Sequence, residues 1–386
     1  MELEAWHLLV LPLFFGLGWM AARVDIRHVM RESRAVPASY FKGLNFLLNE
    51  QPDKAIEAFV EIARLDPDTL ELHYALGALF RRRGELDRAI RIHQNLVDRS
   101  DLNQQQRLKA LYELGQDFFK AGLLDRAEAI FKTLETGAHA LDALGHLLDI
   151  YVLEKDWERA IVTAQRLEKM GCPSRHADIA HYHCELALDA MLRKDMDTAA
   201  QQLERARIAN RKSARAIQLL GDLQALQERH EAAIEVWREM ESLNPAYLPI
   251  VADRLFQAHQ QLGRAQACID LLKGYLVRRP SADLFHILFH AVQQTQGWQA
   301  AARLAGEELR RNPSLRILDD YLQARNAEVG ESDIESRLAQ DLVHEQASRI
   351  AYYQCRECGF KARQFFWQCP ACARWESIPP ERSEHD

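Results

Sequence analysis

The chain has 386 residues, of which 48% are hydrophobic and 27% charged, and its formal net charge at pH 7 is −7. This acidic balance, with a pI near 6.1, excludes a general electrostatic attraction to nucleic acid. With only 17 glycines and 12 prolines, the composition is typical of an ordered chain, long enough for two or three domains. We therefore expect a folded protein of several parts that has no nucleic-acid partner.

The N-terminal segment is apolar. Residues 5–22 contain no formally charged side chain, and as a helix they would extend over about 27 Å, at the short end of what crosses a bilayer. Trp6 and Trp19 lie near the two ends, where indole rings favour the membrane interface. Two glutamates precede the segment, whereas a cleaved signal peptide would begin with basic residues. We therefore predict an uncleaved transmembrane anchor over residues 1–22.

Positive charge is concentrated on one side of this segment. No Lys or Arg precedes it, whereas four arginines follow it closely, at Arg23, Arg27, Arg31 and Arg34. Positively charged flanks of a transmembrane segment remain in the cytoplasm. We therefore expect the N-terminus on the opposite side of the membrane and the chain from Arg23 onward in the cytoplasm. Residues 23–35 then form a basic linker next to the membrane, and the cysteines further along the chain lie in a reducing compartment.

Small and aromatic residues recur with a period of about 34 residues through the middle of the chain. Two successive units carry Gly43, Phe46, Ala55 and Phe59, and then Gly77, Phe80, Ala89 and His93. Small residues continue at similar steps as Ala127, Ala160, Ala199, Ala233, Cys268 and Ala301. The pattern resembles the tetratricopeptide repeat, in which small residues let two antiparallel helices pack closely. We predict about eight units over residues 36–313, with longer turns near residues 100–101 and 171–173.

A single helical pair cannot bury its apolar stripe, so neighbouring pairs stack into a superhelix with a concave groove. Such a groove typically binds a protein or peptide, and it rarely supports catalysis, which needs rigid, convergent groups. Two further helices are expected over residues 314–349, separated by a turn at residues 329–331, and a capping box at residues 332–335 begins the second. We therefore predict an all-α fold in which a helix at the end caps the array.

Four cysteines near the C-terminus form two CxxC pairs separated by ten residues: Cys355, Cys358, Cys369 and Cys372. Two such pairs can place four thiolates at the corners of a tetrahedron, the arrangement that Zn²⁺ or a single iron prefers. Disulfides are the alternative, and a reducing compartment disfavours them. We therefore predict one tetrahedral metal ion, iron or zinc, in a module over residues 350–386.

This module is too small to build a large core of its own, so the metal ion is expected to act as a structural staple. The two cysteine pairs resemble the knuckles of rubredoxin, but the spacer is far shorter, and Ala373 stands where rubredoxins usually have glycine. These departures disfavour electron transfer. Five aromatic residues are expected to pack the knuckles and to dock the module on the last helices: Phe360, Phe365, Phe366, Trp367 and Trp375.

A second group of metal-binding residue types lies within the repeats: Cys172, His176, His181, His183 and Cys184. On a helix His181 and Cys184 would share a face while His183 points elsewhere, so we expect ordinary packing there. Cys268 occupies a small-residue position of its repeat and is expected to act as a small hydrophobic residue. The sequence contains no GxxxxGK[ST], GxSxG or HExxH motif, and we expect that the protein is not an enzyme.

The order of apolar anchor, tetratricopeptide array and rubredoxin-like tail resembles the lipopolysaccharide assembly protein B (LapB) family of Gram-negative bacteria over the full length. The resemblance implies that Cys355, Cys358, Cys369 and Cys372 are the metal ligands. It further implies an inner-membrane, single-pass adaptor with a periplasmic N-terminus, which restrains lipopolysaccharide synthesis by promoting degradation of the deacetylase LpxC by the protease FtsH. Two alternatives stay open: a general scaffold for lipopolysaccharide assembly enzymes at the membrane, and a metal- or redox-sensing adaptor.

Overall fold

The computed structural model describes residue 19 and residues 45–46, 51–65, 69–329 and 334–383. Apart from Trp19, the predicted membrane anchor over residues 1–22 and the linker over residues 23–35 lie outside these ranges. The first two residues of the predicted capping box lie outside them as well. Within the described ranges, no helix combines enough length with enough apolar character to cross a bilayer.

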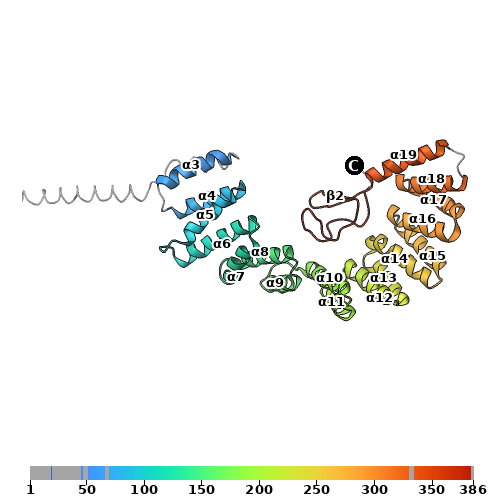
Figure 1. Ribbon diagram of the computed structural model, residues 1–386, viewed down its shortest axis with the longest axis horizontal. Coiled ribbons are helices and arrows are strands. Elements are labelled where there is room, and N and C mark those ends of the chain that lie inside the picture. Colours follow the sequence, from blue (N-terminus) through green and yellow to red (C-terminus); the bar gives the residue numbers. More distant parts are fainter. Residues whose placement is uncertain (1–18, 20–44, 47–50, 66–68, 330–333, 384–386) are drawn as a thin grey trace, which may run out of the picture. The chain divides into compact units, whose positions relative to one another are not determined.

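Helices are the dominant element of the described chain, which divides into two compact units after residue 150. In the first unit the helices follow one another as consecutive hairpins (Figure 1). They are α3 (Pro52–Leu65), α4 (Leu70–Arg82), α5 (Leu86–Val97), α6 (Gln104–Lys120), α7 (Leu124–Thr133) and α8 (Ala140–Leu153), the last of which ends just beyond the boundary.

The second unit continues the hairpins and ends in a small module with little regular structure. Its helices are α9 (Trp157–Lys169), α10 (His176–Leu192), α11 (Met196–Ala209), α12 (Ala214–Leu226), α13 (His230–Leu243), the 3-10 helix η1 (Pro245–Tyr247), α14 (Leu248–Gln261), α15 (Ala265–Arg278), α16 (Ala282–Gln296), α17 (Trp298–Arg311), α18 (Leu315–Val329) and α19 (Ile334–Ile350). The module contains a two-stranded antiparallel sheet of β1 (Tyr353–Gln354) and β2 (Lys361–Ala362).

The small residues of the repeat pattern lie where helices approach most closely. Each is the fourth residue of the second helix of its hairpin, and each is 0% exposed: Ala55, Ala89, Ala127, Ala160, Ala199, Ala233, Cys268 and Ala301. A larger side chain there would hold the two helices apart, because interiors are packed without spare volume. The predicted all-α tetratricopeptide-repeat fold is therefore confirmed over the described residues. One continuous core of buried residues extends from Ala214 in α12 to Ala324 in α18.

The first helix of a hairpin also carries a position that must stay small. A Cβ added at Gly221 in α12 would overlap the indole ring of Trp237 in α13. The Trp237 ring is buried, and its Nε1 donates a hydrogen bond to the Gln218 carbonyl 3.1 Å away. Glycine at residue 221 therefore makes room for a large aromatic side chain from the second helix.

Two steps of the repeat period are longer than the others, and the sequence predicts inserted turns for them. The loops at residues 98–103 and 170–175 lie where those turns are expected. Part of the extra length, however, lengthens the following helices, since α6 and α10 have 17 residues each whereas α12 has 13. The Asn103 side chain begins α6 by accepting a hydrogen bond from the Gln106 amide at 2.8 Å, which completes a capping box.

A buried polar network replaces an aromatic residue in one hairpin of the first unit. His93 occupies the position that Phe59 and Phe131 hold in neighbouring repeats. Its Nδ1 lies 2.5 Å from Asp117 Oδ2, and both side chains are fully buried. Arg81 pairs with the other oxygen of Asp117 at 2.7 Å. A buried carboxylate is stable only when it has such partners. Since the three residues lie on α4, α5 and α6, the network joins these helices.

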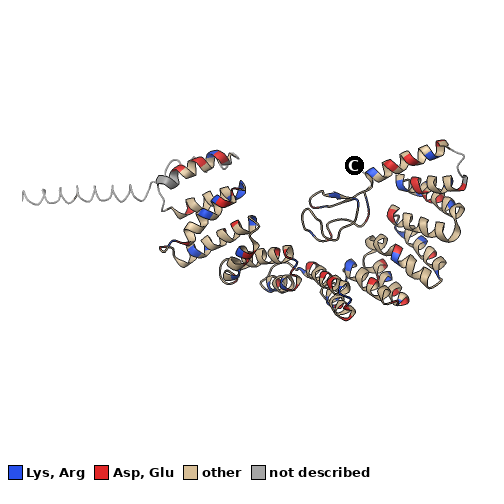
Figure 2. Ribbon diagram, viewed as in Figure 1, with Lys and Arg blue, Asp and Glu red and all other residues tan. Residues whose placement is uncertain are grey.

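Side chains of both charges are interspersed along the helices of each unit (Figure 2). Some pair between successive hairpins, as Arg207 does with Glu239 at 2.9 Å and Arg264 with Glu231 at 3.0 Å. Ion pairs at the protein surface, such as Arg264 with Glu231, contribute little stability individually. The array is therefore held mainly by the apolar faces that neighbouring hairpins bury against each other.

Candidate metal centre

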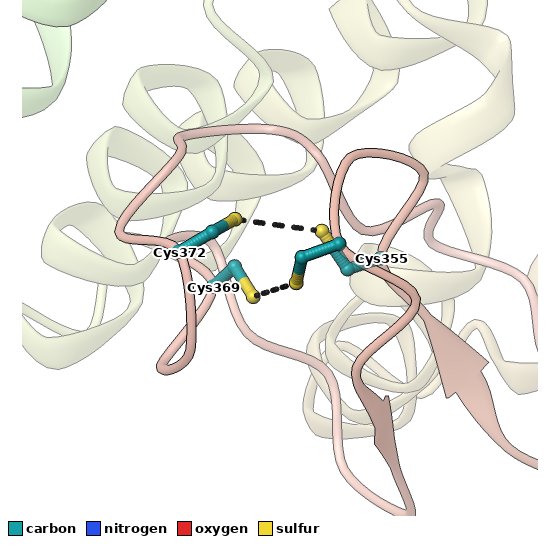
Figure 3. A group of neighbouring side chains, drawn as sticks. Cys355, Cys369 and Cys372 are labelled. Carbon is teal, nitrogen blue, oxygen red and sulfur yellow. Dashed lines mark hydrogen bonds between the residues drawn. The ribbon is translucent and has the colours of Figure 1, made fainter. Parts of the chain in front are cut away.

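The structure brings the four predicted cysteines together in the C-terminal module (Figure 3). The Sγ atoms of Cys355 and Cys372 are 3.7 Å apart, as are those of Cys358 and Cys369, and all four sulfurs lie within 4.8 Å of one another. With Zn–S bonds of about 2.3 Å, neighbouring sulfurs of a regular tetrahedron would be about 3.8 Å apart. Two of the sulfur–sulfur separations therefore match the edge of a tetrahedral four-thiolate site, and the other four are close enough for the same ion.

The two CxxC loops share one backbone hydrogen-bond pattern. In the first, the Cys355 carbonyl accepts a hydrogen bond from the Gly359 amide at 3.0 Å, and the Cys355 amide donates one to the Phe360 carbonyl at 2.9 Å. In the second, the Cys369 carbonyl accepts one from the Ala373 amide at 2.8 Å, and the Cys369 amide donates one to the Arg374 carbonyl at 2.9 Å. Both loops thereby turn back on themselves and present their two sulfurs to the same point.

This shared turn requires left-handed backbone at the residue after the second cysteine. Gly359 has φ of 75° and Ala373 has φ of 55°. The conformation suits glycine, whereas a residue with a Cβ pays about 1–2 kcal/mol for it. The second knuckle therefore contains a strained residue where the first contains glycine.

Ala373→Gly is accordingly expected to stabilise the module by about 0.5–1 kcal/mol, since part of the relieved strain is offset by greater freedom of the unfolded chain. The gain would be measured as slower release of the metal ion to a chelator. Ala371→Gly is a matched control in the same loop, because Ala371 lies outside the left-handed region and should gain nothing. Equal effects of the two substitutions would contradict this account of the turn.

Local polar groups favour the thiolate form of one cysteine. The hydrogen bond between Cys355 Sγ and the Ser377 hydroxyl, 3.3 Å apart, is the largest cause that lowers the pKa of Cys355 to about 6, and backbone hydrogen bonds at Glu357 and Cys358 lower it further. Because the thiolate is the form that binds metal, this cysteine is prepared for binding at neutral pH. Cys355 and Cys369 are also buried, and they form a small core with Tyr353 and Ile378. Nothing in the sequence indicated that Ser377 is a hydrogen-bond partner of Cys355.

The module is docked on the repeats through Trp375. This ring stacks on His181 of α10 with a centroid distance of 4.5 Å and an interplanar angle of 8°. The Arg215 guanidinium of α12 lies 5.2 Å from the same ring, and Trp157 of α9 meets it edge-on at 6.4 Å. His181 Nε2 is also 3.1 Å from Glu376 Oε1, so the adjacent residues Trp375 and Glu376 both contact α10. Stacking, cation–π and hydrogen-bond contacts therefore converge on one tryptophan.

Two further contacts extend the docked surface. Trp367 stacks on Tyr247 of η1 with a centroid distance of 5.2 Å and an interplanar angle of 6°. At the end of the module, the Arg382 amide donates a hydrogen bond to Asp283 of α16 at 2.8 Å, and Arg316 of α18 pairs with the same carboxylate. The module is thus attached to the array at points from α9 to α16.

The sequence-based expectation that the aromatic residues dock on the last helices is wrong for the two tryptophans. Trp375 and Trp367 contact α9, α10, α12 and η1, which lie far earlier in the chain. Phe360, Phe365 and Phe366 pack against the cysteine core, as expected. The difference arises because the chain turns back after α19, and residue spacing contains no information about that reversal.

The second group of histidines and cysteines has separate contacts. His183 Nδ1 lies 2.8 Å from Gln202 Oε1, while His181 faces the docked module. Burial raises the pKa of Cys184 to about 12, which keeps its thiol protonated and unreactive. Cys268 is fully buried and its pKa is likewise raised to about 12 by burial. The role of His181 in docking was missed by the sequence analysis.

Four converging sulfurs leave no open coordination position on a tetrahedral ion, which is the arrangement of structural zinc and single-iron sites. The rubredoxin metal binding domain family matches residues 353–380, and the tetratricopeptide repeat family matches residues 42–101. The geometry and the family match therefore agree on one tetrahedral metal ion in this module, and both zinc and iron fit four thiolates.

Curated relatives match the chain along nearly its whole length. Lipopolysaccharide assembly protein B of Escherichia coli strain K12 is 35% identical over 97% of this chain and 97% of its own. The protein of the same name from Haemophilus influenzae is 28% identical over 98% of each chain. A crystal structure of a tetratricopeptide repeat protein from Parabacteroides merdae is 14% identical, covers 75% of this chain and all of its own, and aligns with a TM-score of 0.35. Identity at this level over this length shows that the chain belongs to the lipopolysaccharide assembly protein B family.

Proposed function

We propose that this protein is an inner-membrane adaptor in lipopolysaccharide assembly, which promotes degradation of the deacetylase LpxC by the protease FtsH. The observation that carries the proposal is the match over 97% of both chains with a relative named lipopolysaccharide assembly protein B. The repeat array supports an adaptor role, because stacked helical hairpins offer extended surfaces for other proteins. The four-thiolate geometry supports a structural role of the metal, since it leaves no position for a substrate.

In this proposal each part of the chain has one task. Residues 1–22 anchor the protein with its N-terminus in the periplasm, and residues 23–35 connect the anchor to the cytoplasmic part. The array over residues 36–313 and the capping helices over residues 314–349 provide the surface that holds a partner. The module over residues 350–386 binds one iron or zinc ion through Cys355, Cys358, Cys369 and Cys372.

The mechanism would be tethering. A cytoplasmic substrate must meet a protease embedded in the membrane, and an adaptor held in the same membrane raises the local concentration of one near the other. Effective concentrations in the millimolar range are typical for short flexible connections. No new chemistry is needed, because FtsH performs the proteolysis.

A pull-down of the full-length protein from solubilised membranes tests the choice of partners. Recovery of FtsH together with LpxC would support the proposal. Recovery of many lipopolysaccharide biosynthetic enzymes without the protease would favour a general scaffold instead.

Metal analysis of protein purified without oxygen would decide between iron and zinc, because iron is then not lost through oxidation of the site.

Deletion of residues 1–33 is expected to abolish control of LpxC while leaving a folded, soluble protein. The expectation follows because the hairpins and the module have their own buried cores, whereas tethering needs the bilayer. LpxC half-life in cells would lengthen to that of cells without the protein, and circular dichroism would show an unchanged helical array.

The matched control replaces residues 1–22 by an unrelated single-pass helix of the same orientation. Restored turnover of LpxC would support tethering alone, and failure to restore it would indicate that the native segment also makes specific contacts. Normal LpxC turnover with the soluble truncation would contradict the proposed mechanism.

A further inference from the structure

Two histidines and an aspartate cluster between α16 and α18, away from the four cysteines. His286 and His290 are one turn apart on α16, so their side chains share one face of the helix. Asp320 of α18 faces them, with Oδ1 2.8 Å from His286 Nδ1. One ligand atom from each of the three side chains lies within 4.8 Å of the others.

The carboxylate of Asp320 gives a second, independent indication of a ligand. Its side chain is only 3% exposed, yet its Oδ2 atom is buried without a hydrogen-bond partner. A buried polar atom left without a partner costs about 1–3 kcal/mol, and more for a charged group. Arg316, one turn earlier on α18, pairs with Asp283 instead. The cluster therefore contains a buried anionic oxygen with spare binding capacity.

We propose that His286, His290 and Asp320 form a second metal site, which binds a divalent transition cation such as Zn²⁺. Two imidazoles and one carboxylate are a common three-residue ligand set for zinc and for other divalent first-row metals. The cation would meet the unpaired oxygen of Asp320 and replace the proton between this residue and His286. The site is independent of the proposed adaptor function and differs from the thiolate site in its ligand chemistry.

A cavity adjoins the cluster on the side of His286 and Asp320. It has a volume of about 280 Å³, and its polar lining residues include His286, Asp319, Asp320 and His344 together with three arginines, Arg316, Arg363 and Arg382, whereas His290 lies outside it. A cation on three protein ligands keeps a fourth position for water, and this cavity would hold that water. Bound there, the ion would cross-link α16 to α18 where the module is attached through Asp283.

The test measures zinc bound by the full-length protein. The protein is purified in detergent without a histidine tag, its tightly bound ion is retained, and it is dialysed against rising concentrations of free Zn²⁺. We expect one further equivalent of Zn²⁺ per chain. His286→Ala, His290→Ala and Asp320→Asn should each lower the affinity for this second Zn²⁺ ion by about tenfold or more. Even mutation of a residue that only supports a metal ligand lowers metal affinity by that much. The tightly bound ion should stay in all three variants.

His73→Ala is the matched control, because His73 lies on α4, far from the cluster in the chain, and its Nδ1 contacts the carbonyl of Thr69, the N-cap residue of the same helix. It should leave both equivalents unchanged. The decisive variant is His286→Ala, whose parent side chain is 41% exposed and can be removed without opening the core. Absence of a further equivalent in the unaltered protein, or its persistence in both histidine variants, would overturn the proposal.

Discussion

A protein with Cys355→Ser and Cys358→Ser is expected to lose its tightly bound metal ion and the fold of its C-terminal module. Two thiolates cannot hold a tetrahedral ion tightly, and binding of a structural zinc supplies about 10–16 kcal/mol in small zinc-dependent folds. The remaining core of the module is small, consisting of Tyr353, Ile378 and a few aromatic residues besides the cysteines. Without the ion, this core should not stay folded.

Elemental analysis and hydrogen exchange would measure the two losses. Metal content should fall by one equivalent, and amides of α10 and α12 should exchange faster, because the module covers His181 and Arg215 on these helices. Helices α4 and α5 of the first unit should be unchanged, since helical repeats couple mainly to their neighbours. This pattern differs from that expected for a module docked only on the last helices.

Cys172→Ser is the matched control, because Cys172 lies in the loop before α10 and outside the four-sulfur cluster. It should keep the metal ion and the normal exchange pattern. Equal loss of metal from the control and from the double variant would refute the assignment of the ligands. Unchanged exchange in α10 after loss of metal would show that the ion does not support docking.

Trp375→Ala should detach the module from the repeats while leaving the metal ion bound. The indole supplies the stack on His181, the cation–π contact with Arg215 and the edge contact with Trp157. Truncating such a central aromatic contact typically costs about 2–4 kcal/mol. In hydrogen exchange α10 and α12 should lose protection, whereas the knuckle amides of Cys355 and Cys369 should keep theirs, since their hydrogen bonds lie within the module.

Two variants separate docking from general damage. Trp375→Phe should restore part of the protection, because a phenyl ring can still stack on His181. Arg374→Ala removes an exposed neighbouring side chain and should change little. The same variants test whether docking serves the proposed adaptor function. If Trp375→Ala cells degrade LpxC normally, the docked position of the module is not needed for recognition of the partner.

The repeat architecture could be predicted from the sequence because it depends on local packing. Residues such as Ala89 and Ala233 must be small where two helices of one hairpin cross, so they recur at a fixed period and are fully buried. The four cysteines were predictable for a similar reason. Two CxxC pairs with a short spacer can bring four sulfurs together through local turns, and the structure places these sulfurs within 4.8 Å of one another.

Contacts between distant residues were decided only by the tertiary structure. Trp375 could be recognised as a docking residue, but its position on His181 depends on how the chain turns back after α19. The pairing of His93 with Asp117 and the cluster of His286 with Asp320 depend likewise on the stacking of hairpins. Residue types within one element reveal a face or a turn, whereas the partner of that face is set by the packing of elements far apart in the chain. The sequence by itself therefore determined the repeats and the meeting of the cysteines, and the folded chain decided where the module docks and which polar groups meet.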